Sequence, residues 1–332
     1  MKLSTVPNGT PDGELFIVAR DNATMVSATG IAPTLQSALD RWNDVAPALA
    51  QRAAQLNEGS AKGALAFPPP ALSAPLPRAW QWLDGSAFHS HGELASRVYG
   101  INPPSRVRPL MYQGLSNPFL GPNDDVEFTT EDDGIDFEGE FGVIVDEVPM
   151  GISAADAAQH IRLVVQINDW SLRFIGPEEM KTGFGFVQTK PACSMAPIAV
   201  TPDELGTAWE NCRIGLDLHV VWNGALFGKP NGREMGFGFH ELVAHAARTR
   251  RLCAGTIIGS GTVANATFRE VGSACIAERR GMEKGDHGNE RTPYMKFGDT
   301  IRMEARTAEG RALLGAIDQK VVRVRTARAP FV

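Results

Sequence analysis

The chain of 332 residues is long enough for one large domain, or for a small domain joined to a larger one. Apolar residues make up 43% and charged residues 21%, which are ordinary values for a compact globular protein and exclude a largely disordered chain. Nucleic-acid binders are normally more basic than a net charge of -6 allows, so we expect no nucleic-acid partner. The start of the chain lacks the apolar core of a signal peptide and no later stretch has the length of a bilayer span, so we expect a cytoplasmic protein without a membrane partner.

The N-terminal part of the chain carries one strand signal and one helix signal. The segment ELFIVAR at 14–20 predicts a short strand, and apolar residues recur at helical spacing from Thr34 onward. The stretch FPPPALSAPLP at 67–77 combines proline density with low charge, which favours an extended connection. We therefore expect a small N-terminal domain at 1–75 and a larger domain at 76–332.

Strand signals dominate the larger domain. They lie at 136–146, 162–169, 213–222, 256–260, 300–305 and 320–325. The Asn223-Gly224 pair predicts a tight hairpin, because both positions of such a turn need positive φ. Helical patterns are fewer, at 153–161 and 240–250. The sequence therefore predicts an α+β, β-rich fold.

The cysteines indicate neither a disulfide framework nor a zinc site. Cys193, Cys212, Cys253 and Cys275 are scattered along the chain and form no C-x-x-C pair. Any metal ligands must therefore be sought among oxygens.

Glu138 and Glu140 are two residues apart on a predicted strand, so both carboxylates should project from one face. Such close like charges force one group to take up a proton, unless a hard cation such as Mg²⁺, Ca²⁺ or Mn²⁺ neutralises them. A solvated polar face is the alternative, and this pair alone favours it.

Two further charged positions follow. Asp169 ends an apolar strand and needs a partner, which is either a metal ion or Arg173 in a structural ion pair. Lys190 precedes a proline among small and apolar residues, where it could hold a fixed positive charge near a developing anion. A lysine whose stem lies on the surface is the alternative.

Upstream, Asp84, His89 and His91 place one carboxylate and two imidazoles within a few residues. Histidine is the commonest general base near neutral pH. His89 and His91 also form an H-x-H pair of the kind seen in zinc sites, but so loose a pattern arises often by chance.

These fragments occur in the order and spacing of the fumarylacetoacetate hydrolase family, which the sequence resembles from about Leu76 to the C-terminus. The run NDWSLR at 168–173 resembles the family's NDWSxR segment, and Glu138-Gly139-Glu140 resembles its ExE metal pair. Lys190 matches the family's lysine, and Asp84 and His91 have the separation of the metal-binding aspartate and catalytic histidine of fumarylacetoacetase.

Further matches and departures concern the substrate end of the site. Tyr112 resembles the family's substrate-contacting tyrosine, and Thr262 lies in a segment like its late GT loop. Gly176 stands where the family's best-described member has a glutamine that contributes to the oxyanion site. Glu278 is the best counterpart of the glutamate that orients the catalytic histidine, although the alignment slips by two residues, a shift that preserves the face on a strand.

The resemblance implies a mixed β-sandwich/β-roll domain of the family's type behind a small N-terminal domain with an SH3-like barrel. It implies hydrolysis of a C–C bond in a 1,3-diketo acid such as fumarylacetoacetate, in the catabolism of tyrosine or other aromatic compounds. It further implies a homodimer and a divalent cation, Mg²⁺, Ca²⁺ or Mn²⁺, that polarises the carbonyl under attack. The implied metal ligands are Asp84, Glu138, Glu140 and Asp169. The implied catalytic residues are His91, Glu278, Lys190 and Arg173. The implied substrate contacts are Tyr112, Arg173, Lys190 and Thr262.

Other activities on the same scaffold share these residues. They are acylpyruvate or fumarylpyruvate hydrolysis, oxaloacetate decarboxylation and isomerisation of a dienoate. A degenerate metal-binding scaffold protein is the non-enzymatic alternative, but every implied position carries a chemically competent residue.

Overall fold

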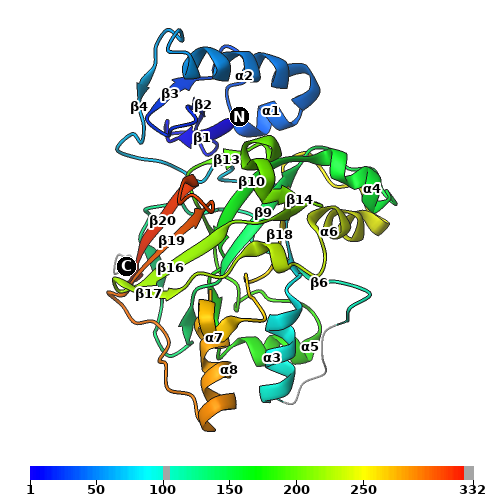
Figure 1. Ribbon diagram of the computed structural model, residues 1–332, viewed down its shortest axis with the longest axis vertical. Coiled ribbons are helices and arrows are strands. Elements are labelled where there is room, and N and C mark those ends of the chain that lie inside the picture. Colours follow the sequence, from blue (N-terminus) through cyan, green and yellow to red (C-terminus); the bar gives the residue numbers. More distant parts are fainter. Residues whose placement is uncertain (100–104, 325–332) are drawn as a thin grey trace, which may run out of the picture.

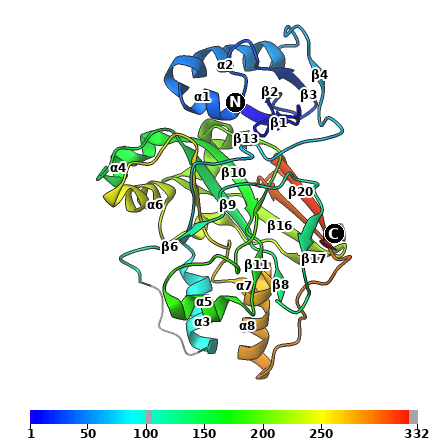
Figure 2. The same ribbon diagram turned by 180° about the vertical axis from the view of Figure 1, so that it is seen from behind.

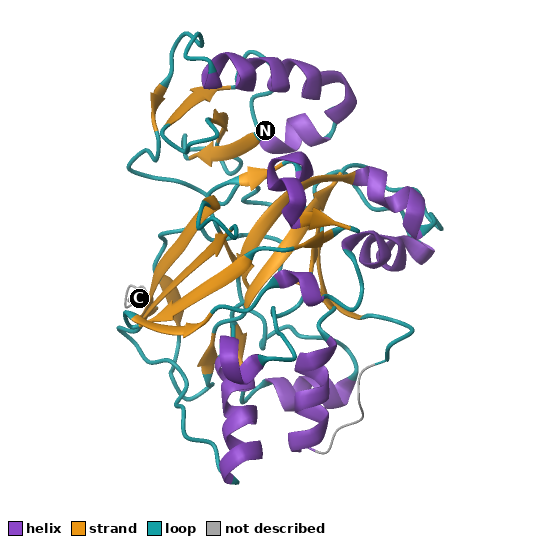
Figure 3. Ribbon diagram, viewed as in Figure 1, coloured by secondary structure: helices purple, strands orange, loops and turns teal. Residues whose placement is uncertain are grey.

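The computed structural model describes residues 1–99 and 105–324 as a small N-terminal unit seated on a larger, strand-rich body (Figure 1). The N-terminal unit lies at one end, the main strands lie in the middle, and a group of helices lies at the opposite end, as the view from behind also shows (Figure 2). The strands of the middle region outweigh its helices (Figure 3), which confirms the predicted β-rich α+β fold.

The N-terminal unit is an antiparallel sheet with two helices. Its elements are β1 (Lys2–Val6), β2 (Glu14–Val18), β3 (Thr24–Ser27), α1 (Leu35–Leu39), α2 (Trp42–Asn57) and β4 (Leu65–Ala66). The single helical pattern predicted from Thr34 is divided between α1 and α2, and the Thr34 hydroxyl caps α1 by accepting from the amide of Ser37. The order β4-β3-β2-β1 is open, and β1 pairs with β13 (Ala199–Val200) of the larger body, so the unit differs from the expected SH3-like barrel.

The same sheet continues through the larger body in the order β13-β10-β9-β18-β5-β6, with β12 beside β10. Its strands are β5 (Trp82–Ser86), β6 (Leu110–Gly114), β9 (Gly139–Val145), β10 (Ile161–Asn168), β12 (Ser194–Met195) and β18 (Thr256–Gly259). Strands β9 and β10 are antiparallel, whereas β18 runs parallel to β5. The order brings β10, β9, β18 and β5, which are far apart in sequence, next to one another.

A second sheet has the order β17-β16-β19-β20-β7. Its strands are β7 (Val126–Phe128), β16 (Asp217–Trp222), β17 (Ala225–Gly228), β19 (Thr300–Arg306) and β20 (Ala312–Arg323). Val143 of β9 shares one hydrophobic core with Leu218 of β16 and Met303 of β19. The buried amide of Gln166 on β10 donates to the carbonyl of Met303 at 3.0 Å and accepts from the amide of Ala305 at 2.8 Å, which joins the two sheets by hydrogen bonds.

The predicted hairpin at Asn223-Gly224 is confirmed, because it connects β16 to β17. Both residues have positive φ, 49° and 79°. The predicted strands are also found, although some are divided or displaced by a few residues. The short remaining strands are β8 (Ile135–Asp136), β11 (Ser171–Leu172), β14 (Trp209–Glu210) and β15 (Arg213–Ile214).

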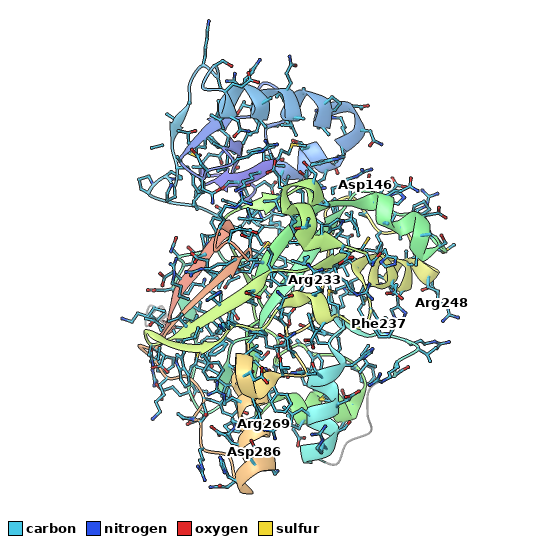
Figure 4. All side chains as sticks on the ribbon, in the orientation of Figure 1. Asp146, Arg233, Phe237, Arg248, Arg269 and Asp286 are labelled. Atoms are coloured by element: carbon cyan, nitrogen blue, oxygen red, sulfur yellow. The ribbon has the colours of Figure 1, made fainter. Side chains whose placement is uncertain are left out.

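Six helices of the larger body are α3 (His89–Tyr99), α4 (Ala154–Ala157), α5 (Gly176–Thr182), α6 (Phe239–Ala246), α7 (Phe268–Val271) and α8 (Ile276–His287). α4 and α6 occupy the two predicted helical patterns, and 3-10 turns extend both. The end away from the N-terminal unit is formed by α3, α5, α7 and α8 (Figure 1). There the ion pair of Arg269 with Asp286 joins α7 to α8 (Figure 4). Among the described residues, no helix has both the length and the apolar character needed to cross a membrane.

Candidate active site

Neighbouring strands bring together three acids from distant parts of the sequence. Asp84 lies on β5, Glu140 on β9, and Asp169 directly follows β10. Glycine allows the close approach, because a Cβ on Gly259 of β18 would lie 2.2 Å from Oδ1 of Asp84. In β9, a Cβ on Gly139 would lie 2.8 Å from Cδ2 of Leu218, so a larger residue there would have to displace that side chain.

Asp84, Glu140 and Asp169 form a buried acidic group. Each offers one carboxylate oxygen, and these oxygens all lie within 4.8 Å of one another. Their exposed fractions are 5%, 0% and 0%. Burial raises the pKa of both Asp84 and Glu140 well above the usual range, and the neighbouring carboxylates raise these pKa values further. The group therefore resists holding all its negative charges without a counter-ion.

Glu140 has the least compensated carboxylate of the three. Neither of its oxygens has a hydrogen-bond partner within the described ranges 1–99 and 105–324. Asp84 accepts from the amide of Gly261 at 3.0 Å, and Asp169 accepts from the side chains described below. An unsatisfied buried carboxylate is costly, so the surroundings of Glu140 fit a cation ligand.

Glu138 is also buried, but it lies in a different electrostatic environment from Glu140. One of its oxygens accepts from Lys190 at 2.7 Å and the other accepts from Arg173. Burial alone would raise the pKa of Glu138, but the two cations outweigh this effect and hold it far below the usual range. The alternative of a solvated polar face is wrong, because both glutamates are buried.

Glu138 is not among the grouped oxygens that could share one ion in the described part of the chain. It precedes the first residue of β9, and its two oxygens are directed to the cations. The predicted four-ligand set is thus present as three grouped acids, with Glu138 beside them.

Lys190 is buried and does not lie on the surface. Its ammonium donates to Glu138 at 2.7 Å, to Asp169 at 2.6 Å and to the hydroxyl of Ser171 at 2.8 Å. These contacts use its three protons. Burial alone would lower the pKa of Lys190, but the charges of Asp169 and Glu138 outweigh burial and raise it.

Asp169 is held by three side chains. Lys190 and the hydroxyl of Tyr112 both donate to Oδ2, and the thiol of Cys193 donates to Oδ1 at 2.9 Å. An ion pair of Asp169 with Arg173 was one reading of the sequence, but the structure pairs Arg173 with Asp136 and Glu138 instead. The sequence marked Cys193 only as a thiol without a disulfide partner.

His91 and Glu278 face each other from two helices, α3 and α8. Nδ1 of His91 lies 3.6 Å from Oε1 of Glu278. Burial alone would lower the pKa of His91, but Glu278 and then Glu138 outweigh burial and raise it, while Arg173 opposes them. The expected proximity is therefore present, although the strand argument for Glu278 is wrong because this residue lies on a helix.

Asp136 is a buried residue of the site that sequence reasoning missed as a functional position. Its carboxylate accepts from the amides of Ile276 and Ala277, at 2.7 and 2.9 Å, and from Nε of Arg173 at 2.7 Å. It thus ties the first turn of α8 to Arg173, and the negative charge suits the N-terminal end of a helix. Burial raises the pKa of Asp136, although Arg173 and the two amides oppose this effect.

The remaining predicted residues lie close to these groups. Thr262 is buried and follows Gly261, whose amide contacts Asp84. Gly176 begins α5 and has no side chain that could replace the missing glutamine. His89 packs its ring edge-on against Phe237, which is labelled in Figure 4. The H-x-H zinc pair receives no support, because neither histidine belongs to a potential metal group within the described residues.

The donor set fits a divalent cation with a preference for oxygen ligands. Asp84, Glu140 and Asp169 supply only carboxylates, as Mg²⁺, Ca²⁺ and Mn²⁺ favour. A bound cation would also balance the local charge. Within the described residues the carboxylate oxygens of Glu140 have no hydrogen-bond partner, and buried acids outnumber buried cations.

Two family models match the chain in succession. Residues 81–322 match the model described as fumarylacetoacetate (FAA) hydrolase C-terminal, and residues 1–78 match fumarylacetoacetase N-terminal domain 2. A 2,4-didehydro-3-deoxy-L-rhamnonate hydrolase of Sphingomonas sp. (strain SKA58) is 28% identical over 164 residues, which cover 48% of this chain and 55% of that protein. A mitochondrial oxaloacetate tautomerase of Xenopus laevis is 24% identical over 168 residues, which cover 48% and 49%. The chain thus spans about half the length of the curated relatives it matches.

Solved structures share the fold along nearly the whole chain. A maleylpyruvate hydrolase of Sphingobium sp. SYK-6, in complex with manganese (II) ion and pyruvate, matches with a TM-score of 0.67 and 18% identity. A probable 2-hydroxyhepta-2,4-diene-1,7-dioate isomerase of Mycobacterium abscessus matches with a TM-score of 0.68 and 19% identity. Both alignments cover 98% of this chain and 100% of the other.

Proposed function

Because the chain belongs to the fumarylacetoacetate hydrolase family, we propose that it hydrolyses a C–C bond in a small 1,3-diketo acid with the help of a divalent cation. Its relatives act as hydrolases, isomerases or tautomerases on small acids. The observation that supports hydrolysis is the pair of His91 with Glu278, 3.6 Å apart, in the same site as the buried acidic group. A carboxylate that faces one nitrogen of an imidazole favours proton uptake by the other.

In this proposal Asp84, Glu140 and Asp169 hold the cation, which polarises the carbonyl of the substrate when bound. Glu138 could join these ligands only if it gave up a contact with Lys190 or Arg173, because both of its oxygens are occupied. Without a role as a cation ligand, Glu138 has the structural role of balancing the charges of Lys190 and Arg173.

His91 takes the proton from the attacking water, and Glu278 stabilises the imidazolium that results. Arg173 and Lys190 supply positive charge to the carbonyl oxygen, which becomes negative when the hydroxide adds to its carbon. The C–C bond then breaks, the departing fragment leaves as an enolate, and the imidazolium of His91 gives its proton to that fragment. Lys190 can donate to that oxygen only after it releases Glu138, Asp169 or Ser171, because these groups use all its protons. Substrate contacts by Tyr112 and Thr262 belong to the same proposal.

A second candidate is keto–enol tautomerisation of a small oxo acid. Two features favour it: Lys190 already donates all three of its protons, and Gly176 has no side-chain donor, so few donors are free to stabilise an oxyanion. Proton transfer between carbon and oxygen needs a base and a polarised carbonyl, but no addition of hydroxide. The relatives that are named oxaloacetate tautomerases add support.

The experiment that tests both is a spectrophotometric screen of purified protein with Mg²⁺, Mn²⁺ or Ca²⁺. The substrates are fumarylacetoacetate, fumarylpyruvate, other acylpyruvates, oxaloacetate and a dienoate. We expect cation-dependent loss of the diketo absorbance, with two acids as products by mass spectrometry. Enol-to-keto conversion of oxaloacetate without cleavage of any diketo acid would replace hydrolysis by tautomerisation, and decarboxylation or dienoate isomerisation would identify the other family activities.

A further inference from the structure

Ser273 is a buried serine that precedes α8, and it contacts the carboxylate of Glu278. It is 0% exposed, and its hydroxyl lies 2.5 Å from Oε2 of Glu278. The same hydroxyl lies 2.8 Å from the carbonyl of Cys275 and accepts from the amide of Cys275 at 3.2 Å. A hydroxyl has one proton, and the shorter distance and the negative charge of Glu278 favour donation to the carboxylate.

The contact with Ser273 occupies one oxygen of Glu278 and leaves the other for His91. Oε1 of Glu278 faces Nδ1 of His91 at 3.6 Å, and neither atom has a hydrogen-bond partner in the described part of the chain. The Glu278 backbone is also fixed, because its amide donates to Sγ of Cys275 at 3.2 Å. A carboxylate held at one oxygen cannot rotate without breaking that hydrogen bond, so its second oxygen keeps a set direction.

We propose that Ser273 is a positioning residue, which orients the carboxylate of Glu278 toward His91 and thereby supports the imidazole as a base. The serine acts through Glu278 and does not itself touch His91. This inference rests on the proposed base role of His91, but the orientation of Glu278 can be measured without any substrate.

The charged groups around His91 determine how readily its imidazole takes up a proton. Glu278 and Glu138 favour the protonated imidazole, whereas Arg173 disfavours it. Removal of the Ser273 hydroxyl takes away no hydrogen bond of Glu138 or Arg173, but it takes away the contacts with Glu278 and with the backbone of Cys275. A change at His91 in such a variant therefore reports on Glu278.

The experiment follows the His91 ring by NMR across a pH titration in wild type and Ser273→Ala, with cation present and without substrate. A His91→Asn variant assigns the signal. We expect the pKa of His91 to move down in Ser273→Ala, because a freely rotating Glu278 spends less time facing the ring. Where a substrate is turned over, we expect kcat to fall roughly tenfold with KM nearly unchanged, the lower end of the loss seen when the outer partner of a metal-ligating histidine is removed.

Two further variants separate positioning from loss of stability. Ser273→Thr keeps a hydroxyl and should restore the pKa and kcat toward the wild-type values, whereas Ser273→Cys, which keeps the size but donates weakly, should resemble Ser273→Ala. Thr256→Val is the matched control, because Thr256 is also 0% exposed and its hydroxyl donates only to the carbonyl of Cys253, at 2.8 Å. It should lose comparable thermal stability without any change at His91.

An unchanged or raised pKa of His91 in both Ser273→Ala and Ser273→Cys would overturn the inference. An equal shift in Thr256→Val would also overturn it, because a general loosening of the fold would then explain the result. If the pKa shifts as expected but no substrate is hydrolysed, the positioning role stands and the proposed hydrolysis fails.

Discussion

The acidic side and the helical side of the site are built in different ways. On the acidic side, Asp84, Glu140 and Asp169 lie on or beside neighbouring strands and carry buried charge that their surroundings do not fully compensate. On the helical side, His91 and Glu278 face each other from α3 and α8. Cation binding and proton transfer therefore depend on separate structural elements, and substitutions should affect the two functions separately.

Replacement of His91 should abolish most of the activity and leave the acidic group intact. His91→Ala should lower kcat by about 100-fold to 10,000-fold, the usual contribution of a general base. Cation affinity should stay within a few-fold of the wild type, because His91 is not a member of the acidic group. Turnover assays and calorimetric cation titrations of the same preparation measure the two quantities, and an equal loss of both would remove the separation between the two sides.

The second effect concerns stability on the acidic side. Glu138→Gln in the presence of a chelator should lower the free energy of unfolding by about 3 kcal/mol, near the lower end for breaking a buried ion pair. The reason is that Lys190 and Arg173 lose a shared charged partner, although Asp169 and Asp136 still compensate them. Chemical denaturation measures this difference, and a variant as stable as wild type would mean that Glu138 does not hold the two cations.

Replacement of Glu140 should stabilise the protein without a cation, in contrast to replacement of Glu138. Glu140→Gln with a chelator should raise the free energy of unfolding by about 1–3 kcal/mol near pH 8, because an uncompensated buried carboxylate becomes a neutral amide. A carboxyl group whose pKa is raised in the folded state destabilises that state as pH rises above the unfolded value. The gain should therefore shrink as the pH is lowered toward the ordinary pKa of glutamate, and a stability loss like that of Glu138→Gln would contradict the account.

The smallest effect concerns Glu179, which fixes the loop that leads to Lys190. Its carboxylate accepts from the amides of Val187, Gln188 and Thr189 and from the Thr189 hydroxyl. These hydrogen bonds outweigh burial and lower the pKa of Glu179 to about 2.

A carboxyl group with a lowered pKa stabilises the fold above its unfolded value of 4.5, and this stabilisation is lost as pH falls toward about 2. Wild type should therefore exceed Glu179→Gln in thermal stability by a small margin at pH 7, and the margin should shrink below pH 4.5. Thermal unfolding between pH 7 and pH 3 measures it. A margin independent of pH would mean that the carboxylate charge does not hold the loop.

The acidic side could largely be predicted from sequence, because its signals are local. The ExE pair and Asp169 stand at or near the ends of apolar strands, and charged residues in such places stand out. The different surroundings of Glu138 and Glu140 could not be predicted, because they depend on where Lys190 and Arg173 fold back.

The helical side left weaker signals. α3 and α8 are mostly polar, and Leu94, Phe268 and Met282 form only a small hydrophobic cluster at this end. Periodicity therefore did not reveal either helix, and Glu278 was placed on a strand. The contacts of Asp136 with Ile276 and Ala277 join segments that are distant in sequence, so no local pattern predicts them.

Cation binding by the acidic group is tested most directly by a titration with Mn²⁺ followed by electron paramagnetic resonance, with wild type and Glu140→Gln compared at the same pH. We predict one tightly bound ion per chain in wild type and no saturable binding in the variant over the same concentration range. Glu140 has no hydrogen-bond partner within the described residues, so its replacement removes a cation ligand without breaking a hydrogen bond. Equal binding by the two proteins, or no binding by wild type, would contradict a metal site at Asp84, Glu140 and Asp169.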